Sequence, residues 1–164
     1  MVLIRKANLK DAPFIVELYK EYNEEHDSER IKETPQLKPY LELKENAQEI
    51  IKKNVLKDIV SVKSAFFIAE LNGSFVGFIE VGVGSFPNEY KIEKAGHIYV
   101  LFVKKENRSK SISSKLKVAA YKWIKQKGIN YVRINVVGNN IKAHQIYKKW
   151  GFIDYLALKI RKIH

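Results

Sequence analysis

The chain has 164 residues, of which 46% are hydrophobic and 29% are charged, a balance typical of a folded domain rather than a disordered chain. It contains no cysteine, which excludes disulfide scaffolds, thiolate catalysis and cysteine-ligated zinc. No apolar run approaches the roughly 18 residues of a membrane span, and Arg5 and Lys6 interrupt the N-terminal apolar residues before a signal-peptide core can form. We therefore expect one domain, residues 1–164, in a soluble cytoplasmic protein without a membrane partner.

Charge is distributed unevenly along the chain. Residues 1–102 hold 14 basic and 16 acidic side chains, whereas residues 103–164 hold 16 basic and only two acidic ones, Glu106 and Asp154. An excess of +14 in the last third favours a polyanionic ligand, such as a phosphorylated cofactor, nucleic acid or an acidic surface. The alternative interpretation is a lysine-rich solvated surface.

The first part of the chain predicts a strand, two helices and a loop. Residues 2–4 are typical of a strand, and Asn8 with Asp11 three residues later is typical of a helix cap. That helix continues into an acidic patch formed by Glu21, Glu24, Glu25, Asp27 and Glu29. Residues 28–43 lack periodicity and contain two prolines, so they are expected to form a loop, and a second helix is expected over residues 45–58.

The middle of the chain predicts a hairpin and a further strand. Strands are expected over residues 65–71 and 75–83, joined by Asn72 and Gly73, because Asn-Gly supplies the two positive φ angles of a tight hairpin turn. A polar loop follows, and then a buried strand over residues 97–103.

The last third alternates helix and strand. A helix over residues 112–123 is followed by a strand over 131–137, a helix capped by Asn140 and ended by Gly151, and a final strand over 152–160. The resulting order, β-α-α-β-β-β-α-β-α-β, predicts an α/β sandwich around a mixed central sheet.

A polar segment joins the strand at 97–103 to the next helix. Exposed amides at a helix N-terminus bind anions, and this segment adds two cations and three hydroxyl donors. We predict a diphosphate site there, and surface charge is the alternative for its cations. The segment comprises Arg108, Ser109, Lys110, Ser111, Ile112 and Ser113.

Two stretches, HIYVLFVKKENRSKSISSKL and INVVGNNIKAHQIYKKWGF, resemble the acetyl-CoA-binding core of the GNAT N-acetyltransferase superfamily. The order of elements fits the same family from Ile4 to Ile160. In the family's loop motif, Q/R-x-x-G-x-G/A, the chain has Arg108, Ser111 and Ser113. Its second motif, N-x-x-A-x-x-x-Y-x-x-x-G-F, is matched by Asn140, Ala143, Tyr147, Gly151 and Phe152.

The resemblance implies acetyl-CoA as cosubstrate. Backbone groups of Phe102 and Val103 would pair with the pantetheine arm, the amides of residues 108–113 would hold the pyrophosphate, and Asn140 would hydrogen-bond the pantetheine. Tyr147 would be the general acid for the leaving thiolate, since a phenol keeps its proton at neutral pH. The alternatives are a plain helix cap for Asn140 and a core aromatic for Tyr147.

The chain departs from the family pattern at two places. Ser111 and Ser113 replace glycines that allow close backbone approach to phosphate. The family's usual carboxylate positions hold Tyr99 and Asn135, neither of which can act as a base.

The general base is therefore open. We expect Glu80 to act through an ordered water, with a structural role as its alternative; His97 and an amine that arrives deprotonated are further alternatives.

The implied reaction is acetyl transfer to a primary amine of a small molecule or peptide, by direct attack in a ternary complex. The alternative is a weak or inactive CoA-binding regulatory module. A nucleic-acid partner is disfavoured because no basic-aromatic strand motif or helix-turn-helix spacing is present. No metal is expected, since His26, His97, His144 and His164 lack ligand spacing.

The acceptor stays open at this point among polyamines, protein N-termini, lysine side chains, aminoglycosides and small amino compounds. Family analogy also allows a homodimer through the C-terminal strand or the sheet edge.

Overall fold

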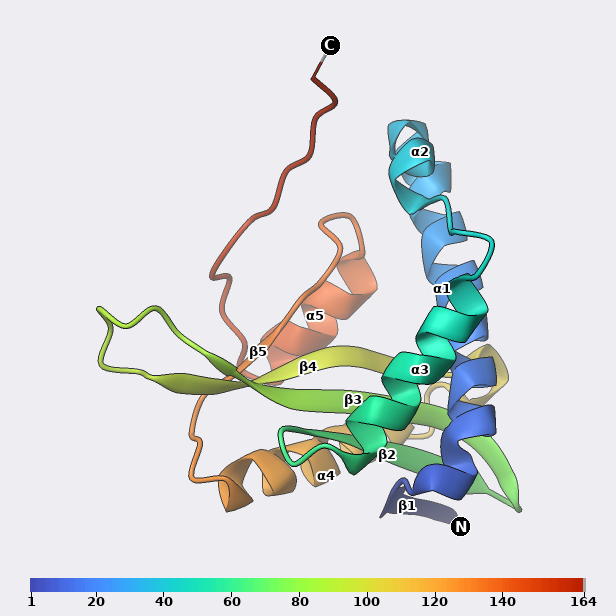
Figure 1. Cartoon of the computed structure of the whole chain (residues 1–164), viewed down its shortest axis with the longest axis vertical. Helices are drawn as coiled ribbons and strands as arrows, with labels where there is room; N and C mark the ends of the chain where they lie inside the picture. The colour runs from blue at the N-terminus through green and yellow to red at the C-terminus, as the bar shows by residue number, and fades with distance from the viewer. Residues whose placement is uncertain (164) are drawn as a thin grey trace. The chain divides into compact units, whose positions relative to one another are not determined.

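The structure is a computed structural model that describes residues 1–163, so His164 lies outside the described residues. The chain forms two compact units, one from Met1 to Ile134 and the other from Asn135 onward. The first unit holds a five-stranded sheet with the strands in sequence order and all pairs antiparallel except the last. The mixed sheet is as predicted (Figure 1). Its strands are β1 (Val2–Lys6), β2 (Ser64–Leu71), β3 (Ser74–Ser85), β4 (Lys94–Val103) and β5 (Val132–Ile134).

Helices cover both faces of this sheet, which confirms the α/β sandwich. The helices α1 (Ala12–Glu33) and α3 (Ala47–Val60) lie side by side on one face, and α4 (Ile112–Gln126) lies on the other (Figure 1). The core on the first face is built from apolar side chains of α1, α3, β2, β3 and β4, including Ile15, Leu18, Phe66 and Phe78. This burial supplies most of the driving force for packing the helices onto the sheet.

Local turn chemistry agrees with the sequence. Asn72 and Gly73 have φ angles of 52° and 79°, as a two-residue hairpin turn requires. The side chain of Asn8 accepts from the backbone of Lys10 and forms a capping box with Asp11, although the cap opens a short 3-10 turn that leads into α1.

The expected loop over residues 28–43 is largely helical, so that prediction is wrong. Helix α1 continues to Glu33, and two short helices follow, η2 (Pro35–Leu37) and α2 (Lys38–Leu41). Each proline stands in the first turn of one of these short helices, where its missing N–H is not needed and its fixed φ favours the helix. The prolines therefore start helices here instead of breaking one.

The second unit contains α5 (Ile141–Lys149), which is capped by Asn140 and followed by Gly151 in a left-handed conformation at φ 86°. The predicted final strand over residues 152–160 is wrong, because the described residues after Gly151 form no helix or strand. Apolar side chains there stay exposed, with Leu158 at 95% of its full accessible surface. A strand needs a neighbour for its backbone hydrogen bonds, and no described strand pairs with this segment.

The predicted strand over 131–137 is also shorter, since β5 spans only three residues. Within residues 1–163, no helix combines the length and apolar character needed to cross a bilayer.

Candidate active site

A buried carboxylate lies on the sheet face that α1 covers. Glu80 of β3 is 8% exposed, and the hydroxyl of Tyr19 on α1 donates a hydrogen bond to its Oε2 at 2.5 Å. Burial raises the pKa of the Glu80 carboxyl, and the Tyr19 hydrogen bond opposes part of that rise. Burial and the neighbouring carboxylate also raise the pKa of the Tyr19 phenol. A carboxylate whose pKa is moved toward neutrality is suited to accept a proton.

Strand β4 bulges next to this carboxylate. Glu80 pairs with Val100 and Val81 pairs with Ile98, so Tyr99 is an extra residue on β4. Pairing with β5 extends only over residues 96–98 of β4. Beyond the bulge, the outer edge of β4 has no strand partner in the described chain, and an extended ligand can add there by backbone hydrogen bonds.

The two predicted pantetheine residues lie on the part of β4 whose outer edge has no strand partner in the described chain. The side chains of Phe102 and Val103 are buried in the core. The carbonyl of Val103 accepts a hydrogen bond from Nε of Arg108 at 2.9 Å, which ties the end of the strand to the following segment.

The segment after β4 brings the predicted phosphate ligands to the N-terminus of α4. A short 3-10 turn, η3 (Lys105–Asn107), comes first, and Ser109 and Ser111 then adopt left-handed conformations at φ 66° and 57°. Ser111 is the N-cap of α4, and its side chain makes no capping hydrogen bond. The first amides of a helix have no intrahelical acceptor, so those of Ile112 and Ser113 remain available for an anion.

The cations of this segment already have partners within the first unit. Arg108 donates to Glu25 of α1 at 2.7 Å, and Lys110 donates to the side chain of Asn107 at 3.2 Å. Lys104 pairs with Glu21 of α1 at 2.7 Å. Part of the acidic patch on α1 therefore neutralises the basic residues that follow β4.

The residues predicted in the second unit have local structural contacts. The Asn140 side chain accepts from the amide of Ala143 at 3.0 Å, as a helix N-cap does. The Tyr147 ring packs near the rings of Trp150 and Phe152, with centroid separations of 5.7 and 5.9 Å. These contacts hold the two motif side chains in place within their own unit.

Sequence reasoning did not identify Tyr19 as a partner of Glu80. Its partner Glu80 is 61 residues away, and no local pattern links the two. His97 lies on β4 and stacks on Tyr99 at 4.6 Å. Burial and the nearby Arg133 lower the pKa of the His97 imidazole.

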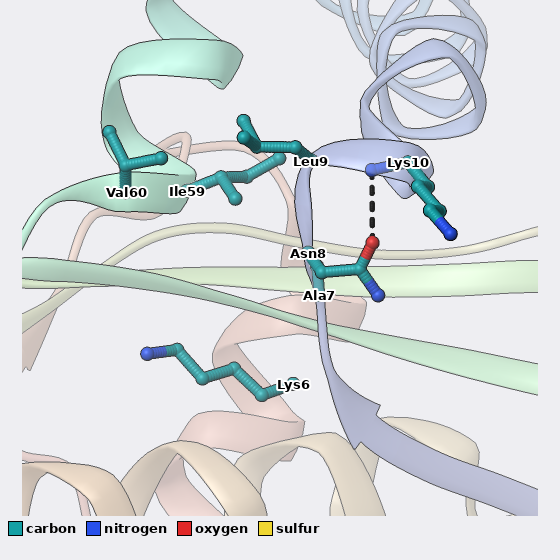
Figure 2. Close-up of a pocket in the computed structure, with 7 residues that line it drawn as sticks. All are labelled: Lys6, Ala7, Asn8, Leu9, Lys10, Ile59 and Val60. Atoms are coloured by element: carbon teal, nitrogen blue, oxygen red, sulfur yellow. Dashed lines mark hydrogen bonds between the residues drawn. The ribbon is translucent and has the colours of Figure 1, made fainter.

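A shallow, solvent-open hollow of about 610 Å³ lies where β1 ends, and Figure 2 shows its lining. None of the predicted site residues lines it, and its only drawn hydrogen bond joins Asn8 to the backbone of Lys10. Across residues 1–163, no group of three histidine, aspartate or glutamate side chains is arranged to hold a metal ion. The residues that line the hollow near the end of β1 are Lys6, Ala7, Asn8, Leu9, Lys10, Ile59 and Val60.

Comparison with known proteins identifies relatives of the chain. The sequence profile of the Acetyltransferase (GNAT) family matches residues 15–152. A mycothiol acetyltransferase of Amycolatopsis mediterranei is 28% identical over 91 residues, which is 55% of this chain and 30% of the relative. An N-alpha-acetyltransferase of Sulfurisphaera tokodaii is 30% identical over 102 residues, which is 59% of this chain and 61% of the relative. The matches thus span less than two thirds of either relative.

The fold also resembles a solved structure of the aminoglycoside N-acetyltransferase AAC(6')-Iy in complex with CoA. The TM-score is 0.75 at 15% sequence identity, with 99% of this chain and 95% of the other covered. At this identity, the likeness establishes a shared fold.

Proposed function

This chain belongs to the Acetyltransferase (GNAT) family, and from that premise we propose that it transfers an acetyl group from acetyl-CoA to a primary amine. The amine attacks the thioester directly in a ternary complex. We propose no covalent acetyl-enzyme, because the chain has no cysteine and no serine of residues 1–163 donates a hydrogen bond to a histidine.

One observation carries the proposal: an anion-binding helix start follows an unpaired strand edge. The left-handed Ser109 and Ser111 precede the free amides of α4, which suit the pyrophosphate of CoA. The edge of β4 at Phe102 and Val103 suits the extended pantetheine arm. The amide nitrogen of Asn140 is proposed to bind the same arm, since its side-chain oxygen serves as the helix cap.

The proposed chemistry balances in protons. The amine nitrogen forms a bond to the thioester carbon, and the carbon–sulfur bond breaks. Glu80 takes the proton lost by the amine through an ordered water, and Tyr147 gives a proton to the leaving thiolate. The raised pKa of the Glu80 carboxyl supports its role as proton acceptor. Proton exchange with solvent then returns Glu80 and Tyr147 to their starting protonation states.

Two of the similar proteins, an N-alpha-acetyltransferase and an aminoglycoside N-acetyltransferase, have names that indicate chemically different acceptors. We propose a small-molecule or peptide amine as the acceptor. A CoA-binding module without turnover is the second candidate, and it is favoured by the non-glycine residues in the left-handed positions of the loop.

Thermal melting with acetyl-CoA tests the cosubstrate, and thiol release tests the reaction. Acetyl-CoA at 100 times its Kd should add about 2.7 kcal/mol to the free energy of unfolding and raise Tm by several degrees. An unchanged Tm at millimolar acetyl-CoA would overturn the proposal. A raised Tm without thiol release from any amine would favour the non-catalytic module. Tyr147→Phe should keep the Tm shift and lose at least tenfold in kcat.

A further inference from the structure

The hairpin of β3 and β4 extends past α1 and α3 (Figure 1), and the sheet face that carries Glu80 also holds side chains that the proposed chemistry does not use. Glu80, Gly82 and Gly84 alternate along β3 and therefore point to one face of the sheet. A Cβ atom at Gly82 would lie 2.6 Å from the Tyr99 ring, and one at Gly84 would lie 2.9 Å from Nη2 of Arg133. Tyr99 and Arg133 therefore lie over two bare glycines, on the face that carries Glu80.

Arg133 differs from the other arginines of its unit. The side chains of Arg5, Arg30 and Arg108 each form an ion pair with a carboxylate. Arg133 forms no ion pair with a carboxylate of residues 1–163, and its Nη2 lies 3.5 Å from the carbonyl oxygen of Ser85. Its Nε, like that of Arg30, is buried and has no hydrogen-bond partner in this part of the chain.

An unsatisfied guanidinium of this kind has a preferred ligand. The N–H groups of arginine form a planar fork that matches the two oxygens of a carboxylate or phosphate. A buried donor without a partner is costly, so a ligand that supplies an acceptor gains that free energy. The observation thus points to an anion at Arg133.

The neighbours hold this guanidinium in place. The Phe86 ring lies 5.2 Å from its Cζ, and His97 is its register partner on β4. His97 stacks on Tyr99, and its Nε2 is likewise buried with no hydrogen-bond partner among the described residues. Tyr99 is 47% exposed, so this row of side chains is reachable from solvent.

We propose that Arg133 anchors an anionic group of the acceptor while the acceptor's amine lies at Glu80, which rests on the proposed function. Arg133 pairs with His97, and His97 pairs with Gly82, so Arg133 lies two strands across the sheet and two residues along it from Glu80, or on the order of 10 Å. The acceptor class is therefore an amine that bears a carboxylate or phosphate on the order of 10 Å away. Wholly cationic amines, including polyamines, lack this group.

Matched pairs of acceptors test whether Arg133 binds the anionic group of the acceptor, which we call the anchor. Trialanine and trialaninamide differ in the carboxylate, and 6-aminohexyl phosphate and 6-aminohexanol differ in the phosphate. The native protein should favour the charged member of at least one pair by tenfold or more in kcat/KM, and the pair that shows this identifies the anion. Arg133→Gln should remove the preference by raising KM for the charged member, while KM for the neutral member stays within twofold.

Three variants distinguish the positive charge of Arg133, the planar hydrogen-bonding geometry of its guanidinium and the position of that group. Arg133→Lys keeps the charge without the fork and should restore part of the preference. Gly84→Ala keeps the arginine but displaces Nη2, the end of a flexible side chain, so it should weaken the preference in a folded protein. Lys125→Gln removes an equal charge from the exposed side of α4 and should change nothing.

Failure of the anchor and failure of the reaction give different results. Equal kcat/KM within both pairs, or a preference that survives Arg133→Gln, would overturn the anchor while leaving acetyl transfer intact. If no amine releases thiol, the proposed function fails, and calorimetric titration with the same two pairs still decides the anchor. Tighter binding of a charged member, lost in Arg133→Gln, would then support it, and equal binding would overturn it.

Discussion

The phenol of Tyr19 donates a 2.5 Å hydrogen bond to the buried carboxylate of Glu80, across 61 residues of sequence. This contact joins helix α1 to strand β3 inside the core, where most neighbouring side chains are apolar. A buried carboxylate is stable in such surroundings only when it is protonated or hydrogen-bonded. The pair therefore couples the stability of the fold to the proton that the proposed reaction moves.

The pH dependence of stability should reveal Glu80. Its folded pKa is raised above the ordinary 4.5 by burial, so the folded state binds this proton more tightly than the unfolded state. The contribution of Glu80 to the free energy of unfolding therefore decreases as pH rises from the unfolded to the folded pKa, and stays lower above it. Glu80→Gln should remove this decrease and be at least as stable as the native protein at pH 7.

Urea unfolding of both proteins between pH 4 and pH 8 measures the effect, since the difference between their free energies of unfolding isolates the one titration. A difference that does not vary with pH would contradict the raised pKa.

Removing the Tyr19 hydroxyl should lower the free energy of unfolding, because the buried charge of Glu80 then lacks a hydrogen-bond donor. Tyr19→Phe leaves Glu80 without this donor, so we expect a loss of about 1–3 kcal/mol in the free energy of unfolding at pH 7. The pKa of the carboxyl should rise further, because the hydrogen bond lowers it. The acid limb of the profile of kcat/KM against pH should then move to higher pH.

Tyr22→Phe is the matched control for this variant. Its ring lies 6.1 Å from that of Tyr19 on the same helix, and its hydroxyl makes no hydrogen bond to Glu80. It should leave the acid limb in place. An equal shift in both variants would mean that Glu80 does not set this limb.

Features encoded in adjacent residues could be predicted from the sequence. The Asn72-Gly73 turn and the cap at Asn140 follow from residue types that favour one local conformation. The bulge at Tyr99 could not be predicted, because it depends on how β4 pairs with β3. The ion pair of Arg108 with Glu25, 83 residues apart, likewise depends on where α1 crosses the sheet.

Ser111 and Ser113, which stand where the family motif has glycines, should respond differently to substitution by glycine. Ser111 has φ 57°, in the left-handed region, which costs a non-glycine residue roughly 1–2 kcal/mol. Ser113 lies inside α4, where glycine is less favourable than an ordinary residue by roughly 0.5 kcal/mol. Ser111→Gly should raise the free energy of unfolding by up to about 1 kcal/mol, and Ser113→Gly should lower it.

Chemical unfolding of the two variants side by side checks this prediction, since both make the same chemical change two residues apart. A loss of stability in Ser111→Gly equal to that in Ser113→Gly would show that the left-handed conformation carries no strain. The binding of acetyl-CoA should follow the same order, because a relaxed backbone at residue 111 presents the amides of α4 at a lower conformational cost.

Under the proposed function, Glu25 would compete with acetyl-CoA for the guanidinium of Arg108. The two side chains are 2.7 Å apart, and Arg108 is 41% exposed and Glu25 31%, so their ion pair contributes about 1 kcal/mol or less to stability. Glu25→Gln releases Arg108 and removes a negative charge near the proposed phosphate site. The Kd for acetyl-CoA should fall by roughly three- to fivefold, because the ion pair that binding must break contributes about 1 kcal/mol or less, with little change in Tm of the free protein.

Glu24→Gln is the control. It removes the same charge from a neighbouring residue that forms no ion pair with Arg108, and should leave Kd within twofold. An unchanged Kd in Glu25→Gln would mean that Arg108 binds no phosphate, and its role would then be confined to the ion pair with α1 and the hydrogen bond to Val103.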